Sequence, residues 1–229
     1  MNKALKILCH IVLIALCVFL AWRIVASVME PVNFNKEKDA RQAVAVQRLK
    51  DIRTLQEAYK SVNGKFTADF DSLAMFYNTG KMEIVMQVGS MDDSLAVANT
   101  EALKKKNRRI TPQEMYARYQ AGENLVFSIK NEIPVRDTVF HSRPDFVIDS
   151  LRYIPFSGGQ EVEMDAVVKT VSGVQVPLFE AKMPYKKLLK GMDNQLRINL
   201  DAERRAANSY EGLQVGSISA PNNNAGNWE

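Results

Sequence analysis

An apolar segment at the N-terminus constrains this chain more than any other feature. Residues 7–22 are sixteen in a row with a single polar member, His10, and after Arg23 the apolar character resumes over residues 24–29. A helix over residues 4–29 would be about 39 Å long at roughly 1.5 Å per residue, which exceeds the hydrocarbon thickness of a bilayer. The sequence therefore predicts a transmembrane anchor at residues 1–30, followed by a linker at residues 31–35 that begins at Pro31.

Three interpretations of this segment are open. A retained anchor fits Trp22 and Arg23, because an indole and a snorkelling guanidinium both suit the membrane interface. A cleaved signal peptide fits the small residues at 25–27, although the apolar stretch is longer than usual for that class. A lipoprotein would use Cys17, but Leu16 stands where a small residue is normally needed. We favour the retained anchor.

The orientation of the anchor is only weakly marked by charge. Lys3 and Lys6 precede the apolar segment, and Lys36, Lys38 and Arg41 follow it, so the positive charges are nearly balanced. A tail of a few residues before one long apolar run usually leaves the rest of the chain outside the cytoplasm. We expect that orientation here.

Composition argues against several classes of function. The net charge is +4, but residues 1–30 contribute +2, and the remainder carries 27 basic and 25 acidic side chains. Such a mixed surface is not typical of a nucleic-acid-binding protein. Both cysteines, Cys9 and Cys17, lie in the apolar segment, and His141 is the only histidine after it. We therefore expect no disulfide, no metal site, no cofactor and no catalytic residues.

An amphipathic helix is predicted over residues 36–64. Asn35 is a suitable N-cap, and Gly64 suits the left-handed residue that follows a last helical turn. One face packs either on the sheet of its own domain or on a partner helix, and both can hold for different parts of the helix. The helical spacing defines a stripe of Gln42, Ala45, Leu49, Ile52, Gln56 and Tyr59, and the predicted partner-helix face is Ala45, Leu49, Ile52 and Tyr59.

We expect residues 65–218 to form one α+β soluble domain with a β-rich second half. We expect the Asn-rich tail that follows, at residues 219–229, to be a loop or disordered. Trp228 is unusual in a free tail, and it could pin the terminus to the sheet or to a partner. We expect helices at residues 71–77, 112–121, 184–190 and 201–208, strands at 82–88, 125–130, 137–140, 146–154, 196–200 and 213–218, and a β-hairpin at 161–182 that turns at Ser172 and Gly173.

Two groups of charged residues have both a functional and a simpler interpretation. The basic run could touch anionic lipid headgroups, or it is a solvated face or loop. The acidic residues alternate on one strand and could bind a divalent cation, or they are the wet face of an antiparallel sheet. The basic run is Lys104, Lys105, Lys106, Arg108 and Arg109, and the acidic residues are Glu161, Glu163 and Asp165.

Residues 50–73 resemble the body of type IV pilins and type II secretion pseudopilins. Tyr59, Gly64, Phe66 and Leu73 stand where that family has a Tyr near the helix end, a Gly, an aromatic residue and a Leu. The resemblance implies a membrane helix, a long amphipathic helix and then mainly antiparallel sheet. The prepilin-peptidase signature is missing, so the resemblance implies a pilin-like shape more than polymerisation into a filament.

The whole chain also resembles uncharacterised single-pass envelope proteins of Gram-negative bacteria. We therefore expect a protein of the bacterial inner membrane whose soluble part lies in the periplasm. Our first hypothesis is a non-enzymatic docking component of a membrane-spanning or pseudopilus-like assembly, with the lipid bilayer and other membrane or envelope proteins, or a second copy, as partners. The alternatives are a tethered module that binds a peptide or glycan near His141 and Arg143, and an enzyme that uses Asp and Glu.

Overall fold

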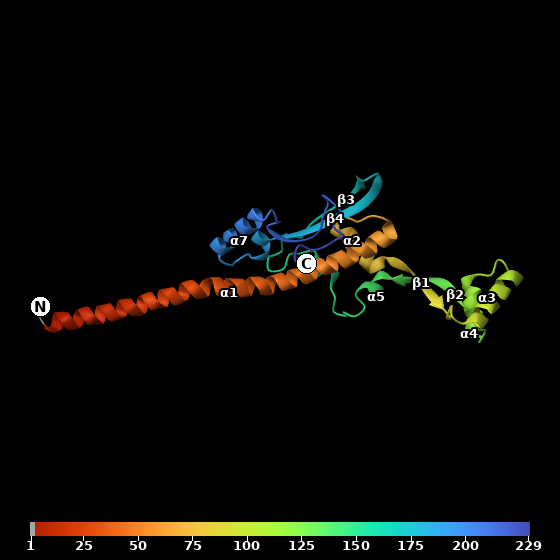
Figure 1. Ribbon diagram of the computed structural model, residues 1–229, viewed down its shortest axis with the longest axis horizontal. Coiled ribbons are helices and arrows are strands. Elements are labelled where there is room, and N and C mark those ends of the chain that lie inside the picture. The colour runs from red at the N-terminus through yellow and green to blue at the C-terminus, as the bar shows by residue number, and fades with distance from the viewer. Residues whose placement is uncertain (1–2) are drawn as a thin grey trace. The chain divides into compact units, whose positions relative to one another are not determined.

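The computed structural model describes the backbone of residues 3–229 and the side chains from His10 onward. Its first element, α1 (Lys3–Asn63), is one uninterrupted helix (Figure 1). The predicted linker at residues 31–35 is therefore wrong, because Pro31 lies inside the helix. A proline removes one backbone hydrogen bond and strains the preceding turn, and here the long helical stretches on both sides maintain the helix through it.

The end of α1 agrees with the sequence. Gly64 adopts a φ of +73°, and its N–H donates to the carbonyl of Lys60 at 2.8 Å. Few residues other than glycine adopt this left-handed conformation without strain, so Gly64 ends the helix where expected.

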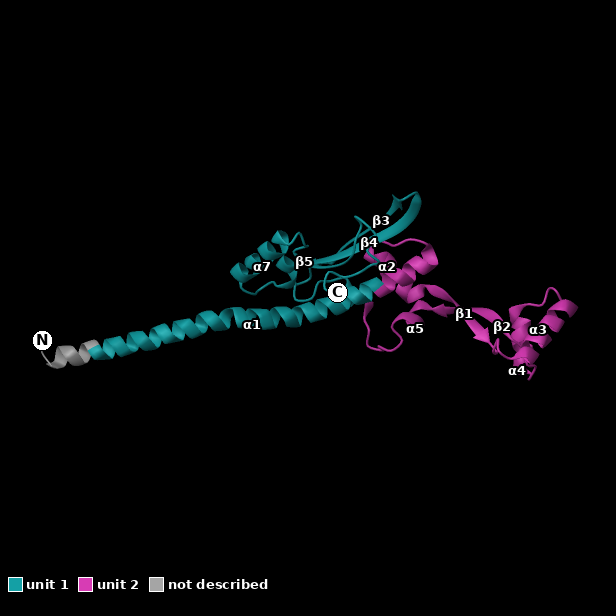
Figure 2. Ribbon diagram, viewed as in Figure 1, with its two compact units in different colours: residues 1–53, 149–229 teal, residues 54–148 magenta. Residues whose placement is uncertain are grey.

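We had expected one domain over residues 65–218, but the chain instead divides into two compact units that share α1 (Figure 2). Unit 1 combines residues 1–53 with residues 149–229, and unit 2 is residues 54–148. Helix accounts for 51% of the chain and strand for 20%, so the mixed α and β class is confirmed, but sheet is not the main component.

Unit 1 contains a three-stranded antiparallel sheet in the order β3–β4–β5. The predicted hairpin is confirmed as β3 (Glu163–Val171) and β4 (Val174–Pro184), with Ser172 and Gly173 both at positive φ in the turn. The last strand, β5 (Gly212–Gly216), pairs with the far end of β4. A 3₁₀ turn η1 (Ile148–Leu151), which begins one residue before the unit, and helices α6 (Tyr185–Leu188) and α7 (Asn194–Ala206) complete this part of the chain.

The Asn-rich tail is a loop, which is one of the two alternatives expected from its composition, and it lies against the sheet of unit 1. Gly226 bridges to Val215 of β5, and the side chain of Asn227 accepts from the backbone N–H of Gln214 at 3.1 Å. The indole of Trp228 is half-buried and so close to Gly226 that an added Cβ would lie 2.3 Å from a ring carbon. Hydrogen bonds to β5 thus order a segment that is poor in apolar side chains.

Unit 2 contains a two-stranded antiparallel ribbon of β1 (Lys81–Val88) and β2 (Phe127–Pro134). Between these strands the chain forms α3 (Ser94–Lys106) and α4 (Pro112–Gln120). A small core forms where the strands meet the two helices, and α4 begins with a capping box formed by Thr111 and Glu114. The remaining helices are α2 (Phe70–Thr79) and α5 (Val135–Val139).

Three predicted strands are wrong. Residues 137–140 fall largely in α5, and residues 146–154 form η1 and an isolated bridge. In this region Phe140 and Phe146 stack with ring centroids 4.0 Å apart, and both rings contact Tyr77. Aromatic packing, not strand pairing, therefore determines the local structure. Residues 196–200 belong to α7, which also includes most of the separate helix predicted at 201–208.

Candidate functional site

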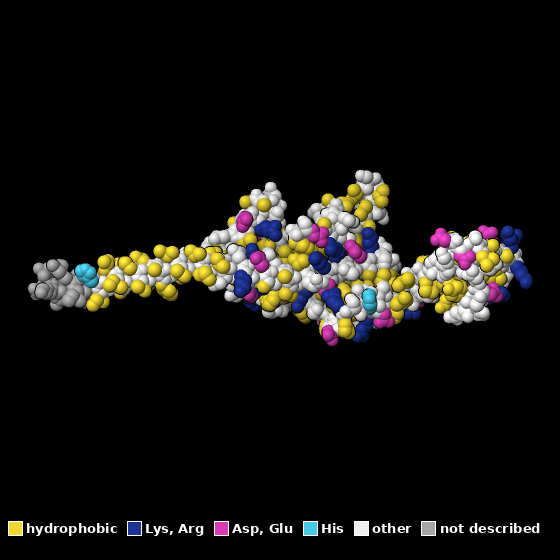
Figure 3. All heavy atoms as spheres, turned by 60° about the horizontal axis from the view of Figure 1, so that its bottom comes forward, with side chains coloured by type: hydrophobic (Ala, Val, Ile, Leu, Met, Phe, Trp, Pro, Cys, Tyr) yellow, Lys and Arg dark blue, Asp and Glu magenta, His cyan; other side chains and the backbone are white. Residues whose placement is uncertain are grey.

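The first part of α1 is a continuous apolar surface. Its side chains between Ile11 and Val32 are largely exposed, for example Phe19 at 53%, Ile24 at 66% and Val28 at 59% (Figure 3). The helix is long and apolar enough to cross a membrane, and its most apolar stretch is 0% buried within the described structure. A core helix of a soluble protein would be mostly buried, so this surface is available to lipid, and transfer of each Val, Leu or Ile from water is worth about 1.5–3 kcal/mol.

The predicted partner-helix face lies instead in the interior of the chain. Ala45, Leu49 and Ile52 are fully buried. Tyr59 is half-buried, and its ring meets that of Phe76 edge to face with centroids 5.2 Å apart. This corrects our assignment of the face to a partner, because the protein's own units already cover it. The simpler interpretation, packing within the chain, holds.

Polar side chains of α1 also join it to the rest of unit 1. Gln42 donates to the hydroxyl of Tyr185 at 2.8 Å, and Arg41 donates to the carbonyl of Lys190 at 2.9 Å. Arg53 forms an ion pair with Glu229 at 2.8 Å, and this hydrogen bond holds the pKa of the Glu229 carboxyl below its usual value. Arg48 donates to the carbonyl of Tyr153, and burial lowers its pKa. Unit 1 is therefore built around the same helix that carries the exposed apolar surface.

The basic run forms an exposed patch on unit 2. It lies on the last turn of α3 and in the turn that follows this helix. Asp93 caps α3 by accepting from the N–H groups of Leu95 and Ala96. At the other end the positive charges complement the helix dipole. The patch consists of Lys104, Lys105, Lys106, Arg108 and Arg109, which are all exposed and form no ion pair with any described residue.

Two of the three acidic residues on and before β3 are engaged by cations of unit 1. Glu163 pairs with Lys187 at 2.8 Å, and Glu161 pairs with Arg152 at 3.6 Å. Glu163 and Asp165 are exposed, as the wet face of a sheet requires. The described residues include no group of three or more His, Cys, Asp or Glu placed to hold a metal ion.

His141 and Arg143, which we had considered as part of a ligand cleft, lie beside the aromatic residues of unit 2. The guanidinium of Arg143 stacks over Phe140 at 4.7 Å and Phe146 at 5.0 Å from the ring centroids. His141 is exposed, and its Nδ1 lies 3.3 Å from the carbonyl of Thr138. These contacts explain both side chains structurally.

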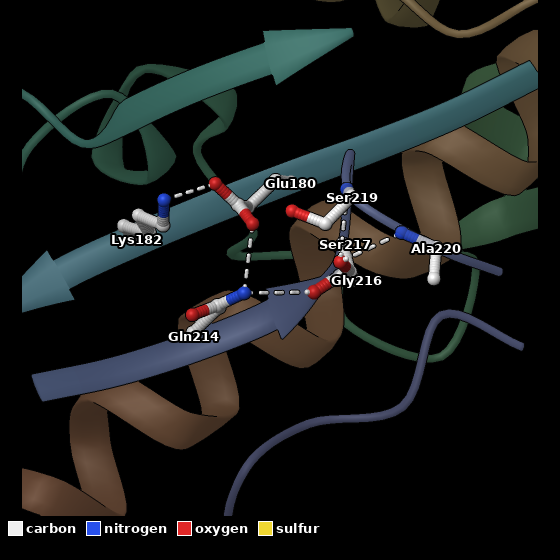
Figure 4. A network of polar contacts seen from close by, with 7 residues as sticks. All are labelled: Glu180, Lys182, Gln214, Gly216, Ser217, Ser219 and Ala220. Atoms are coloured by element: carbon white, nitrogen blue, oxygen red, sulfur yellow. Dashed lines mark hydrogen bonds and ion pairs between the residues drawn. The ribbon is translucent and has the colours of Figure 1, made fainter. Parts of the chain in front are cut away.

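A polar network on the sheet of unit 1 was not predicted from the sequence (Figure 4). Glu180 of β4 is 4% exposed, and it forms an ion pair with Lys182 two residues along the strand. Gln214 of β5 donates to the other Glu180 oxygen at 2.8 Å and to the carbonyl of Gly216 at 3.2 Å. Because an unpaired buried carboxylate is strongly destabilising, these partners are what make Glu180 tolerable there.

A cavity of about 620 Å³ lies close to this network, between α6, α7 and the loop that leads into β5. Tyr210 belongs to both places, because it lines the cavity and Lys182 lies over its ring at 5.4 Å. Burial, and then the nearby carboxylates of Glu163, Glu180 and Glu211, raise the pKa of the Tyr210 phenol. Tyr210 therefore stays protonated across the physiological range. The full lining is Pro184, Lys186, Arg197, Ile198, Asp201, Arg205, Ser209, Tyr210 and Glu211.

Asp201 is the most deeply buried charged residue of this cavity. Its side chain is 8% exposed, one oxygen pairs with Arg197, and Oδ1 has no hydrogen-bond partner among the residues described. Burial raises the pKa of the Asp201 carboxyl, although Arg197 acts in the opposite direction. Arg197 is itself held by Asn194, to which its Nη2 donates at 2.8 Å.

The sequence offered one usable signal for these residues. Asp193 accepts from the N–H of Leu196 at 2.7 Å, so an N-cap precedes the segment that we took for a strand. With residues 194–206 placed in one helix, Arg197 and Asp201 become an i, i+4 pair. No sequence pattern marks Glu180 or Tyr210, because Gln214, which donates to Glu180, and Lys182, which lies over the Tyr210 ring, are both distant in sequence from the residue that they contact.

No known protein family, curated protein or solved structure matches this chain.

Proposed function

We propose that the protein is a non-enzymatic, single-pass membrane protein whose two compact units dock other components of an envelope assembly. The observation that carries this proposal is α1 itself. Its side chains from Ile11 to Val32 are mostly apolar and exposed, and its second half supplies the fully buried side chains of Ala45, Leu49 and Ile52. A helix that both enters the bilayer and forms the interior of a folded unit holds that unit at a fixed position relative to the membrane, because no flexible segment separates the two.

The compartment belongs to the same proposal. With a short N-terminal tail and one apolar span, we place the units in the periplasm and the anchor in the bacterial inner membrane. The bilayer is then one partner, and membrane or envelope proteins, or a second copy of the chain, are the others. The pilin-like resemblance of residues 50–73 is consistent with a role in a pseudopilus-like assembly.

Affinity purification of the full-length protein from its native membrane in mild detergent tests the docking role. Two variants act as comparisons. One replaces residues 1–30 with an unrelated transmembrane helix, and the other begins at residue 33 and is exported without an anchor. Neither variant removes residues 36–63, because unit 1 and unit 2 both need that part of α1.

We expect membrane or envelope proteins to co-purify in stoichiometric amounts with the full-length chain. Partners that dock on the units will also be recovered with the replaced anchor, whereas partners that bind the span will be lost. If the full-length protein is recovered with bilayer lipids but without any other protein, the docking proposal is wrong.

A further inference from the structure

The basic patch of unit 2 concentrates positive charge in a unit that is otherwise balanced. Residues 54–148 carry twelve basic and twelve acidic side chains, so unit 2 has no formal net charge. Five of the twelve cations fall within residues 104–109, and the chain has no acidic residue between Glu101 and Glu114. In the space-filling view, Lys and Arg side chains lie together at one end of the unit (Figure 3). Such a local field attracts an anionic partner although the unit as a whole is neutral.

The patch is held in place by packing and hydrogen bonds on both sides of it. Leu103, before most of the patch, and Ile110, directly after it, pack against the small core of unit 2. The N–H of Asn107 donates to the carbonyl of Leu103 at 2.9 Å, and its side-chain Oδ1 accepts from the N–H of Arg109 at 3.1 Å. The backbone that carries the five cations is therefore ordered before any partner arrives, which lowers the entropy cost of binding.

The nearest acidic side chains do not neutralise the patch. Glu101 is exposed on α3 and forms no ion pair with a described residue. Glu114 accepts from a backbone N–H at 3.0 Å in the capping box of α4. Glu123, which lines a hollow together with Lys106, is paired with Arg118 at 3.1 Å. The positive charges of the patch are therefore available to a partner outside the described chain.

The composition of the patch indicates the class of partner. Residues 104–109 include no apolar side chain. Protein interfaces are depleted of lysine and derive most of their affinity from buried aromatic, apolar or arginine anchors. A surface of anionic lipid needs no such anchor, because the phosphates of several headgroups meet several cations at once and each contact adds to the affinity. The patch therefore fits a lipid surface better than a protein surface.

We infer that the basic patch binds the phosphate groups of anionic lipids, as a membrane contact separate from α1. The contact is electrostatic and lies at the headgroups, so no side chain has to enter the hydrocarbon. Because the five cations are exposed, dissolved ions compete for them and salt weakens the contact. The inference holds whether or not the two units dock other proteins.

Flotation of the full-length protein with lipid vesicles tests this inference. The protein is held in nanodiscs of phosphatidylcholine, so that its span lies in zwitterionic lipid. It is then mixed with vesicles of phosphatidylcholine alone or of phosphatidylcholine with phosphatidylglycerol. We expect it to float with the vesicles that contain phosphatidylglycerol and not with the others. We also expect this binding to be lost at about 1 M salt, where the Debye length falls to about 3 Å.

Variants with the same change in net charge separate the patch from general attraction. Each cation near an anionic surface raises the binding constant by about fivefold, so we expect replacement of all five patch cations by alanine to lower the affinity at least about a hundredfold. Arg108→Lys combined with Arg109→Lys keeps the charge, and we expect unchanged affinity. A control variant replaces five other exposed cations by alanine and is expected to bind like the native protein. These five are Lys65, Arg136, Lys169, Lys186 and Lys190.

Three results would overturn the inference. The native protein could fail to float with the anionic vesicles, or the patch variant and the control variant could lose binding to the same extent. The third result is binding of soluble polyglutamate without binding of the vesicles, which would assign the patch to an acidic protein segment. Each of these results leaves the docking proposal untouched.

Discussion

At the scale of single residues, the protein tolerates two buried carboxylates by different means. Glu180 receives a cation and an amide donor, whereas Asp201 has Arg197 on one oxygen and no partner on the other within the described chain. Burial outweighs Arg197 and raises the pKa of Asp201. A buried carboxylate whose pKa is raised lowers the stability of the folded state once it is charged.

The pH dependence of stability tests this account of Asp201. In the folded protein its carboxyl binds a proton more tightly than in the unfolded chain, where the pKa is near 3.8. Stability contributed by this group therefore falls as the pH rises from the unfolded pKa through the raised folded pKa. Asp201→Asn removes this titration. We therefore expect the melting temperature of the variant, minus that of the native protein, to be larger at neutral pH than at about pH 4. A constant difference across that range would contradict the raised pKa.

Sequence reasoning succeeded at residues whose role is local. Gly64 ends α1 as expected, and Ser172 with Gly173 makes the expected turn. Composition left the tail around Trp228 open between a loop and disorder, and the structure shows a loop. What orders that tail is pairing with β5, and backbone pairing between segments distant in sequence leaves no local signature.

At the scale of elements, α1 decides the architecture. The helical spacing of its buried residues could be predicted from the sequence. The break predicted at Pro31 and the partner surface predicted on the buried face are both wrong. A short segment of alternating apolar and polar residues, such as 196–200, fits both a strand and a helix. The half-buried or buried positions 196, 197, 200, 201 and 204 show the helical spacing that the structure uses. Tertiary packing decided between these alternatives.

A pair of substitutions in α1 tests whether its face packs inside the chain. Leu49 is fully buried, and Val44 is 43% exposed on the same helix. We expect Leu49→Ala to lower the free energy of unfolding by about 2–5 kcal/mol, and Val44→Ala to change it by no more than about 0.5 kcal/mol. Chemical denaturation of the purified protein in detergent measures both. Equal and small effects would instead assign the face to a partner helix.

At the scale of the whole molecule, one helix links a membrane-compatible surface to two compact units. The mixed fold class and the apolar N-terminal helix were predictable, because both rest on composition and periodicity along the chain. The division into units was not, because unit 1 unites residues 1–53 with residues 149–229. That pairing depends on contacts over more than a hundred residues of sequence, for example between Arg41 and Lys190.

The central claim is that α1 is retained and crosses a membrane while the units stay outside the cytoplasm. The protein carries a native probe, because its two cysteines, Cys9 and Cys17, both lie in the apolar segment and Cys17 is a free thiol exposed on the helix. The variant Ser172→Cys adds a third cysteine at an exposed turn residue, and its labelling reports on the compartment of unit 1. The measurement is the intact mass of this variant after treatment of whole cells, and then of detergent-solubilised protein, with a maleimide that passes the outer but not the inner membrane.

We expect one adduct in whole cells, at residue 172, and three after solubilisation in denaturing detergent, since lipid shields Cys9 and Cys17 until then. Labelling of Cys17 in whole cells would contradict insertion in the bilayer. A mass that lacks the first residues would show that the segment is cleaved, and an unlabelled residue 172 in whole cells would place unit 1 in the cytoplasm.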